Sequence, residues 1–282
     1  MSPLNRTDST ERSQIVARLN RMVRRWPEVS GCHLNPDPVV VEGVVGALAQ
    51  SVVETGYSYC PCRDQSGDPR KDRALICPCD YHQDELVRDG HCKCVLFVSD
   101  AYDAERAYTF REDQTGAQGT GQTIAQRDVT VYVTRWCGQS RRALRWLEVK
   151  GIAHEVIDID HDDAAAERVR RYNAGNRSVP TLVVRTVLRE PSPADLERLL
   201  LAPGINLASC DAYVTAWCGQ SRRTLAWLRE NAVAMRVIDI GSDAGAAARL
   251  REWHGGSQSV PTLEVILRLS EPDAPLLERV LG

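Results

Sequence analysis

Three Cys-x-Cys pairs dominate the first half of the chain. They are Cys60-Pro61-Cys62, Cys77-Pro78-Cys79 and Cys92-Lys93-Cys94. Clustered thiolates are ligands for soft metal ions and for iron–sulfur clusters. One cluster takes four thiolates, which leaves two cysteines over. Two such thiols beside a redox cluster could form a disulfide that the cluster reduces.

An alternative interpretation of this segment is a structural zinc site that uses four of the six cysteines. Cys-x-x-Cys is the commoner zinc spacing, and the chain contains none. We expect His82 and His91, which lie in the same segment, to be surface or supporting residues and not ligands.

Composition sets the context for these thiols. The chain has 282 residues, a net charge of −3 and ten cysteines. The small net charge predicts no nucleic-acid or membrane partner, and the polar first residues do not resemble a signal peptide. We therefore expect a cytoplasmic protein. Structural disulfides are rare in the cytoplasm, so clustered cysteines there indicate metal binding or catalysis.

A second pair of thiols lies in an internal repeat. The sequence Trp-Cys-Gly-Gln-Ser occurs at 136–140 and again at 217–221, so the cysteines Cys137 and Cys218 are 81 residues apart. Each follows a β-branched run that predicts a strand and precedes a helical pattern. Because the N-terminus of a helix stabilises negative charge, we expect both cysteines to be acidic and nucleophilic. Neighbouring arginines at 135, 141, 142, 222 and 223 would add positive charge.

The elements that must position these residues follow from the hydrophobic pattern. The pattern predicts helices at residues 12–25 and 39–53. Each repeat then predicts strands at 129–134 and 155–159, helices at 162–172 and 193–201, and a strand after Val-Pro-Thr, with the second copy 81 residues later. Alternating strands and helices indicate α/β layers. We divide the chain into an N-terminal domain (1–112), a flexible linker (113–127) and two repeated domains (128–203 and 209–282).

The first domain resembles the catalytic subunit of ferredoxin–thioredoxin reductase. The resemblance includes the Val-Val-Val-Glu-Gly run at 39–43, the segment at 59–63 and the exit Cys94-Val95-Leu96-Phe97. It implies a mainly α iron–sulfur domain. By this resemblance the [4Fe-4S] ligands would be Cys60, Cys77, Cys79 and Cys92. Cys62 and Cys94 would form the redox-active disulfide, with Cys94 against the cluster and Cys62 attacking the target.

One departure concerns the supply of protons. The family has a histidine between its last two cysteines, where this chain has Lys93, and His91 is a candidate replacement. The loop from 80 to 91 is also longer than usual.

The two repeats are similar to glutaredoxins, most closely to mycoredoxins. The similarity is carried by Trp-Cys-Gly, by Val156 to Asp160 and by Asn173 to Thr181. It implies two α/β thioredoxin-fold domains. By this similarity Val179-Pro180 and Val260-Pro261 would be cis-proline segments that line a groove for a thiol or peptide ligand. Serine replaces the second cysteine of dithiol members, so each domain would act as a monothiol with Cys137 or Cys218. Glutathione and mycothiol are the candidate small thiols.

These resemblances together predict a ferredoxin-dependent disulfide reductase. Electrons from ferredoxin or a similar one-electron donor would pass through Cys62 and Cys94 to a mixed disulfide on Cys137 or Cys218. The substrates would be protein disulfides or thiol-capped proteins. Two alternatives remain open at this point. Cys-Gly-Gln-Ser also resembles monothiol glutaredoxins that carry [2Fe-2S] clusters, and the repeats could instead serve only to dock targets.

Overall fold

The computed structural model describes residues 4–63, 65–107 and 124–282. The described residues form two compact units. The first contains residues 1–110 together with 215–226, and the second contains 111–214 together with 227–282. The expected linker therefore lies mostly outside the described residues, except that 124–127 form the beginning of a strand.

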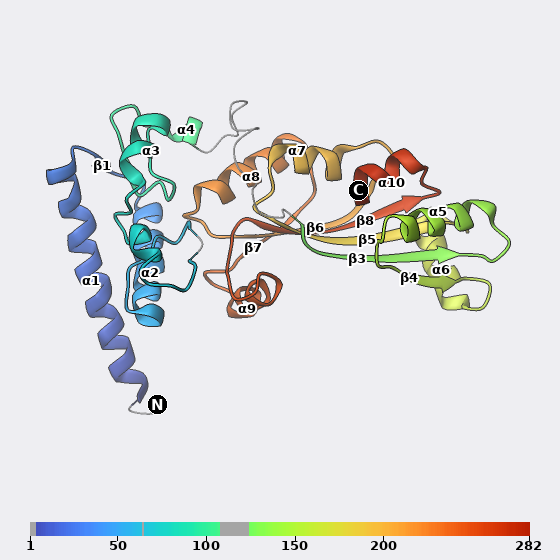
Figure 1. Ribbon diagram of the computed structural model, residues 1–282, viewed down its shortest axis with the longest axis horizontal. Coiled ribbons are helices and arrows are strands. Elements are labelled where there is room, and N and C mark those ends of the chain that lie inside the picture. The colour runs from blue at the N-terminus through green and yellow to red at the C-terminus, as the bar shows by residue number, and fades with distance from the viewer. Residues whose placement is uncertain (1–3, 64, 108–123) are drawn as a thin grey trace. The chain divides into compact units, whose positions relative to one another are not determined.

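The first unit is mainly helical, as predicted (Figure 1). Its elements before residue 110 are α1 (Leu4–Ser30), β1 (His33–Leu34), α2 (Pro38–Thr55), η1 (Asp72–Leu75), α3 (His82–Asp89), β2 (Phe97–Val98) and α4 (Ala104–Ala107). The two short strands pair antiparallel. Helix α1 packs on α2 through Leu19 and Val23, which are buried.

Helix α2 shows why this region folds despite its many valines. Asp37 caps it by accepting a hydrogen bond from the Val39 N–H at 2.9 Å. Pro38 occupies the first turn, and Gly56 ends the helix with φ of +83°. Valine disfavours an isolated helix, but burial of each side chain returns roughly 1.5–3 kcal/mol. The buried residues are Val40, Val41, Val44, Val45, Leu48 and Ala49. By length and composition alone, α2 could also span a membrane.

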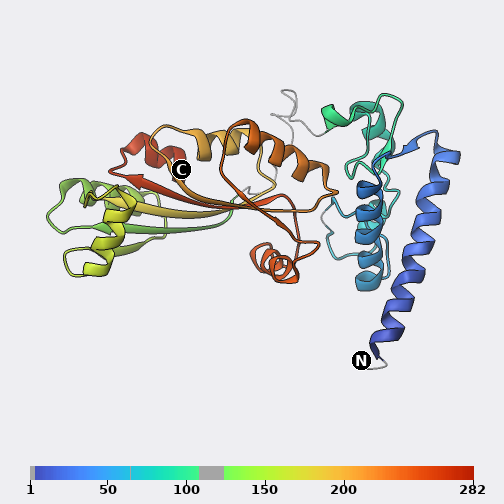
Figure 2. The ribbon, with the colours of Figure 1, turned by 180° about the vertical axis from the view of Figure 1, so that it is seen from behind.

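The second unit is built on a mixed six-stranded sheet. The first repeat contributes β3 (Ile124–Val133), α5 (Gly138–Val149), β4 (Glu155–Asp158), α6 (Asp163–Tyr172), β5 (Thr181–Arg189), α7 (Pro193–Leu196) and η3 (Glu197–Leu201). The second contributes β6 (Asn206–Val214), β7 (Arg236–Asp239), α9 (Ala244–Trp253), β8 (Thr262–Ser270) and α10 (Ala274–Leu281). The second repeat also contains α8 (Gly219–Glu230), of which residues 219–226 belong to the first unit. Helices α7 and α10 lie on one side of this sheet and α9 on the other (Figures 1 and 2).

The two repeats share this sheet, which the sequence did not predict. The strand order is β4-β3-β5-β8-β6-β7, so the repeats meet where β5 pairs antiparallel with β8. The terminal helix of the second repeat also contacts the first repeat. Glu278 pairs with Lys150 at 2.7 Å, and the carbonyl of Leu281 accepts a hydrogen bond from Arg127 at 2.6 Å. The repeats therefore lie side by side in one sheet and also contact each other through the C-terminal helix.

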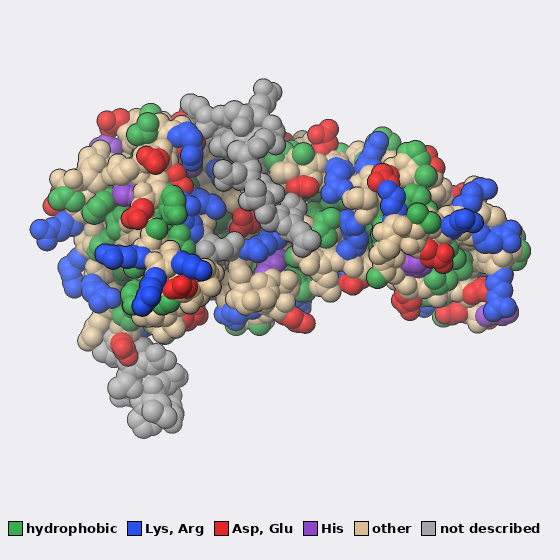
Figure 3. All heavy atoms as spheres, in the orientation of Figure 1, with side chains coloured by type: hydrophobic (Ala, Val, Ile, Leu, Met, Phe, Trp, Pro, Cys, Tyr) green, Lys and Arg blue, Asp and Glu red, His purple; other side chains and the backbone are tan. Residues whose placement is uncertain are grey.

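Each repeat has its own small apolar core, which packs its strands against α6 in the first repeat and against α9 in the second. In the first repeat Tyr132, Ala165 and Val169 are buried together. In the second, Tyr213 and Leu250 are buried together. Acidic and basic side chains are interspersed over the face shown in Figure 3. The α/β prediction for both repeats is thus confirmed.

Candidate functional site

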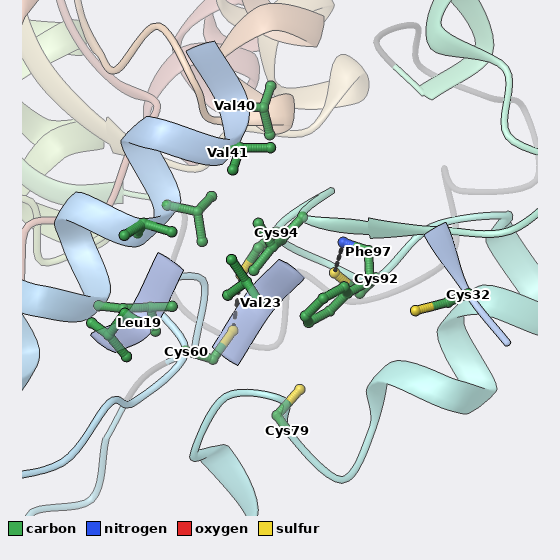
Figure 4. Packing of buried hydrophobic residues seen from close by; sticks show 14 of the residues in the cluster. Leu19, Val23, Cys32, Val40, Val41, Cys60, Cys79, Cys92, Cys94 and Phe97 are labelled. Carbon is green, nitrogen blue, oxygen red and sulfur yellow. Dashed lines mark hydrogen bonds between the residues drawn. The ribbon is translucent and has the colours of Figure 1, made fainter. Parts of the chain in front are cut away.

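Short backbone contacts bring the three Cys-x-Cys segments together. The Cys60 N–H donates to the Leu75 carbonyl at 2.8 Å, which joins the first segment to the chain before the second. The Cys92 N–H donates to the Phe97 carbonyl at 2.9 Å, and the Phe97 N–H donates to the Cys92 sulfur at 3.3 Å (Figure 4). The first contact places the Cys60 segment beside the chain that leads into Cys77, and the other two close the loop that carries Cys92 and Cys94.

The cysteines surround one small cavity. It is lined by Cys60, Cys77, Pro78, Cys79, His82, Cys92, Lys93, Cys94, Leu96 and Phe97. All four cysteines predicted as cluster ligands are in this lining. Among the described residues, no three His, Cys, Asp or Glu groups are close enough to share one metal ion. The structure thus brings the four predicted ligands to the wall of one cavity.

Three sulfurs interact with one another at the edge of this cavity. The Cys60 and Cys94 sulfurs are 2.9 Å apart (Figure 4), and both thiols hydrogen-bond to Cys62. These hydrogen bonds lower the pKa of Cys62 to about 6. The same contacts, together with burial, raise the pKa of Cys94 well above its usual value. Cys62 is also the more exposed of the predicted redox pair, since Cys94 is buried. The asymmetry suits Cys62 as the attacking thiolate.

The other predicted ligands lie in an environment that disfavours free thiolates. Burial raises the pKa of Cys77, and burial also raises that of Cys92 to about 12. The pKa of Cys79 is raised by its hydrogen bond to Cys60 and by burial. A bound cation would reverse this preference, because metal coordination deprotonates thiols.

A buried carboxylate braces the loops of this site and was not found from the sequence. One Glu85 oxygen accepts a hydrogen bond from the Lys93 N–H at 2.9 Å. The other forms an ion pair with Arg63, which follows Cys62 directly. The Arg63 guanidinium also lies 4.3 Å from the Tyr81 ring centre. Glu85 thus connects the loop of Cys62 to the loop of Cys94. A single acidic residue on a polar helix carries no sequence signal for this role.

The two histidines take supporting positions. His82 lines the cavity, and its Nε2 accepts a hydrogen bond from the Trp26 indole at 3.2 Å. His91, the candidate for the family histidine, contacts the Cys92 carbonyl through Nδ1 at 3.0 Å. Burial lowers the pKa of His91. The cavity lining includes His82 and Lys93 but not His91.

In the first repeat, Cys137 lies where the sequence predicted, between strand β3 and helix α5. It is the N-cap of α5, and its sulfur accepts a hydrogen bond from the Ser140 N–H at 3.4 Å. Burial opposes ionisation, but the Ser140 hydroxyl and the N–H groups of Ser140 and Gln139 outweigh it and lower the pKa of Cys137. Of the arginines expected to add positive charge here, Arg135 pairs with Asp158 at 3.1 Å.

Both predicted cis-proline segments are cis. The Val179–Pro180 and Val260–Pro261 peptide bonds are in the cis form. The Cys137 thiol is 3.4 Å from the Val179 carbonyl, so that segment lies beside the reactive sulfur as expected of a ligand groove. A third cis bond, Cys77–Pro78, lies in the cysteine cluster.

The second repeat's thiol segment belongs to the first compact unit. Trp217 packs against the buried core of that unit, next to Gly43 of α2. Any Cβ atom at Gly43 would overlap the Trp217 ring. Arg222 forms an ion pair with Asp37 at 2.7 Å, and this contact lowers the pKa of Asp37.

These contacts give the two equivalent thiol segments different surroundings. Cys218 is buried whereas Cys137 is partly exposed, and Trp136 is 73% exposed. Cys218 is close enough to Cys62 for the two thiols to interact electrostatically.

Comparison with known proteins finds two families in separate parts of the chain. The family model described as ferredoxin thioredoxin reductase catalytic beta chain matches residues 9–116. The glutaredoxin family model matches 129–188 and 211–266. A glutaredoxin homologue of Mycobacterium tuberculosis is 39% identical over 75 residues, which are 26% of this chain and 89% of that protein. Mycoredoxin 1 of Corynebacterium glutamicum is 44% identical over 55 residues, 20% of this chain and 67% of the relative.

The fold, the thiol sites and these matches define a thiol–disulfide oxidoreductase. The chain belongs to the glutaredoxin family through its two repeats, which are fused to a domain of the ferredoxin–thioredoxin reductase catalytic family.

Proposed function

We propose that the chain is a ferredoxin-dependent disulfide reductase. In this proposal Cys60, Cys77, Cys79 and Cys92 hold a [4Fe-4S] cluster, and Cys62 with Cys94 forms the exchanging pair. The observation that carries it is the cavity lined by all four proposed ligands and by Cys94, with Cys62 hydrogen-bonded at its edge. When bound, the cluster supplies electrons one at a time from ferredoxin, whereas a disulfide needs two.

The exchange chemistry falls to the thiols of the chain. A substrate disulfide first reacts with the Cys218 thiolate, which releases one substrate thiolate and leaves a mixed disulfide. The Cys62 thiolate then attacks the Cys218 sulfur and displaces the second substrate thiolate. Cys94 attacks Cys62 in turn, which frees Cys218 and restores the Cys62–Cys94 disulfide. Two electrons have then passed from the cysteine pair to the substrate.

The contacts of Trp217 and Arg222 support Cys218 as the first acceptor. A thiol–disulfide exchange requires the two sulfurs to meet, and the ion pair with Asp37 holds the Cys218 segment within the unit that contains Cys62. In this scheme Cys137 exchanges either with substrates or with Cys218, once Cys218 has been reduced.

The substrates we propose are protein disulfides and proteins capped by a small thiol. Similarity to mycoredoxin and the missing second cysteine both favour a low-molecular-weight thiol such as mycothiol or glutathione as the resolving partner. We also propose a cytoplasmic location, because a reducing compartment keeps the exchange thiols available.

The Gly43 contact offers a sharp test of the route to Cys218. Gly43→Ala should strengthen α2 by about 1 kcal/mol but push Trp217 away, since overpacking costs about 1–3 kcal/mol. We expect reduction of a mixed disulfide on Cys218 by reduced ferredoxin to slow about tenfold. Gly46→Ala is the matched control, because a Cβ there meets nothing within 4 Å. Equal rates in both variants would contradict the proposed route.

The same preparation discriminates against the cluster-carrier alternative. Iron, sulfide and paramagnetic resonance are measured on the anaerobic full chain and on a Cys137→Ser, Cys218→Ser variant. The reductase proposal predicts that the cluster is retained in the variant. Loss of all iron would favour a [2Fe-2S] carrier bound through the Cys-Gly-Gln-Ser segments.

A further inference from the structure

The shared sheet places part of the second repeat at the thiol site of the first. Strands β5 and β8 pair so that Thr181 lies opposite Ser270. The chain leaving β8 therefore runs beside the cis-proline segment of the first repeat. The Glu271 N–H donates to the Pro180 carbonyl at 2.8 Å.

Glu271 and Cys137 flank the same short segment. The Cys137 thiol donates to the Val179 carbonyl at 3.4 Å, and Glu271 contacts the next residue, Pro180. Glu271 is exposed, and its charge acts on the Cys137 thiol. Its φ is +48°, in the left-handed region that favours glycine. The chain thus has an acidic residue at a position whose backbone conformation favours glycine, which has no side chain.

Two arginines near this groove are paired with carboxylates other than Glu271. Arg135 is paired with Asp158 at 3.1 Å, and Arg177 lies 3.7 Å from Asp160. Within the described residues, no ion pair is formed by Glu271. The equivalent segment of the first repeat differs, because Arg189 occupies the position of Ser270 and donates to Ser259 at 2.9 Å.

We propose that Glu271, supplied by the second repeat, is a specificity-determining residue of the Cys137 groove and disfavours thiol ligands that carry negative charge near their sulfur. The groove would then take neutral, hydroxyl-bearing or cationic thiols and thiol-capped peptides in preference to anionic ones. This inference rests on the proposed role of Cys137 as an exchanging nucleophile.

The test compares two alkylating probes on the intact chain. Iodoacetate is anionic and iodoacetamide is neutral, and both react with the same thiolate, so the ratio of their rates at Cys137 is independent of thiolate population. Mass spectrometry of the Cys137 peptide gives each rate. We expect Glu271→Gln to raise the iodoacetate-to-iodoacetamide ratio about two- to fivefold at low ionic strength. High salt should abolish the difference.

The control is Glu190→Gln, which changes the equivalent residue at the other cis-proline, where its N–H donates to the Pro261 carbonyl at 2.8 Å. Its ratio at Cys137 should equal that of the unmodified chain. An unchanged ratio in Glu271→Gln, with fast alkylation of Cys137, would overturn the specificity inference alone. Alkylation of Cys137 no faster than that of a free cysteine would overturn both the inference and the proposed nucleophile.

Discussion

Arg185 joins the two repeats across the shared sheet, and removing it should measure how strongly they are joined. Its guanidinium forms ion pairs with Glu264 of β8 at 2.6 Å and with Asp128 of β3 at 2.8 Å. The Arg185 and Glu264 side chains are 25% and 18% exposed. Glu264 also accepts a hydrogen bond from the Tyr213 hydroxyl at 3.3 Å.

The expected cost of Arg185→Ala lies between two limits. Breaking a fully buried ion pair costs about 3–5 kcal/mol because a charge is left uncompensated. An exposed pair contributes about 0–1 kcal/mol. At a quarter exposure and with two partners, we expect about 2 kcal/mol. A unit of this size loses about 2–4 °C per kcal/mol, so the midpoint of thermal unfolding should fall by about 4–8 °C.

The assay is thermal unfolding followed by tryptophan fluorescence, since Arg185 lies 5.3 Å from the Trp253 ring centre. Lys150→Ala is the control. Its pair with Glu278 also connects the repeats, but the two side chains are 41% and 54% exposed. That variant should lose less than about 2 °C. If both variants shift the midpoint equally, or if neither shifts it, then the partly buried ion pairs of Arg185 do not stabilise the contact between the two repeats.

Three further predictions concern the thiol sites. Ser140→Ala should raise the pKa of Cys137, so the pH profile of Cys137 alkylation should move to higher pH. The Cys137 thiolate stabilises the folded protein above the pKa of the unfolded state, and this stabilisation is lost as the pH falls through the pKa of the folded state. The variant should show a smaller stabilisation of this kind. Glu85→Ala should destabilise the first unit by about 3 kcal/mol in denaturant titration, because Arg63 is left unpaired, whereas an effect below about 1 kcal/mol would mean that the pair is solvated. Cys79→Ser should reduce iron content and visible absorbance without changing alkylation of Cys137, and unchanged iron would remove Cys79 from the ligand set.

The sequence predicted the elements of each repeat because their periodicity is strong and repeated. Strand β4 and helix α6 match the expected ranges within a residue or two. The pairing of β5 with β8 was not predictable, since the alternation of Val184 or Val265 is the same whichever strand lies beside it. The beginning of β3 was also missed, because Ile124 joins the strand through its pairing with Leu188 and not through local pattern.

The candidate site also contains some residues that the sequence predicted and others that it did not. The three Cys-x-Cys pairs stand out by spacing alone. The choice of Cys60, Cys77, Cys79 and Cys92 as ligands came from the family resemblance, and the structure brings these four to one cavity. The roles of Glu85 and Glu271 depend on contacts with residues distant in sequence or in the other repeat, and isolated acidic residues give no pattern to detect.

The central claim is that electrons reach the repeats through Cys62. The most direct measurement is the rate at which reduced ferredoxin cleaves a mixed disulfide between Cys218 and a small thiol in the anaerobic full chain, compared with a Cys62→Ser variant. The account predicts loss of at least about a hundredfold in the variant, while its iron content and the alkylation rate of free Cys218 stay unchanged. Undiminished cleavage without Cys62 would contradict it.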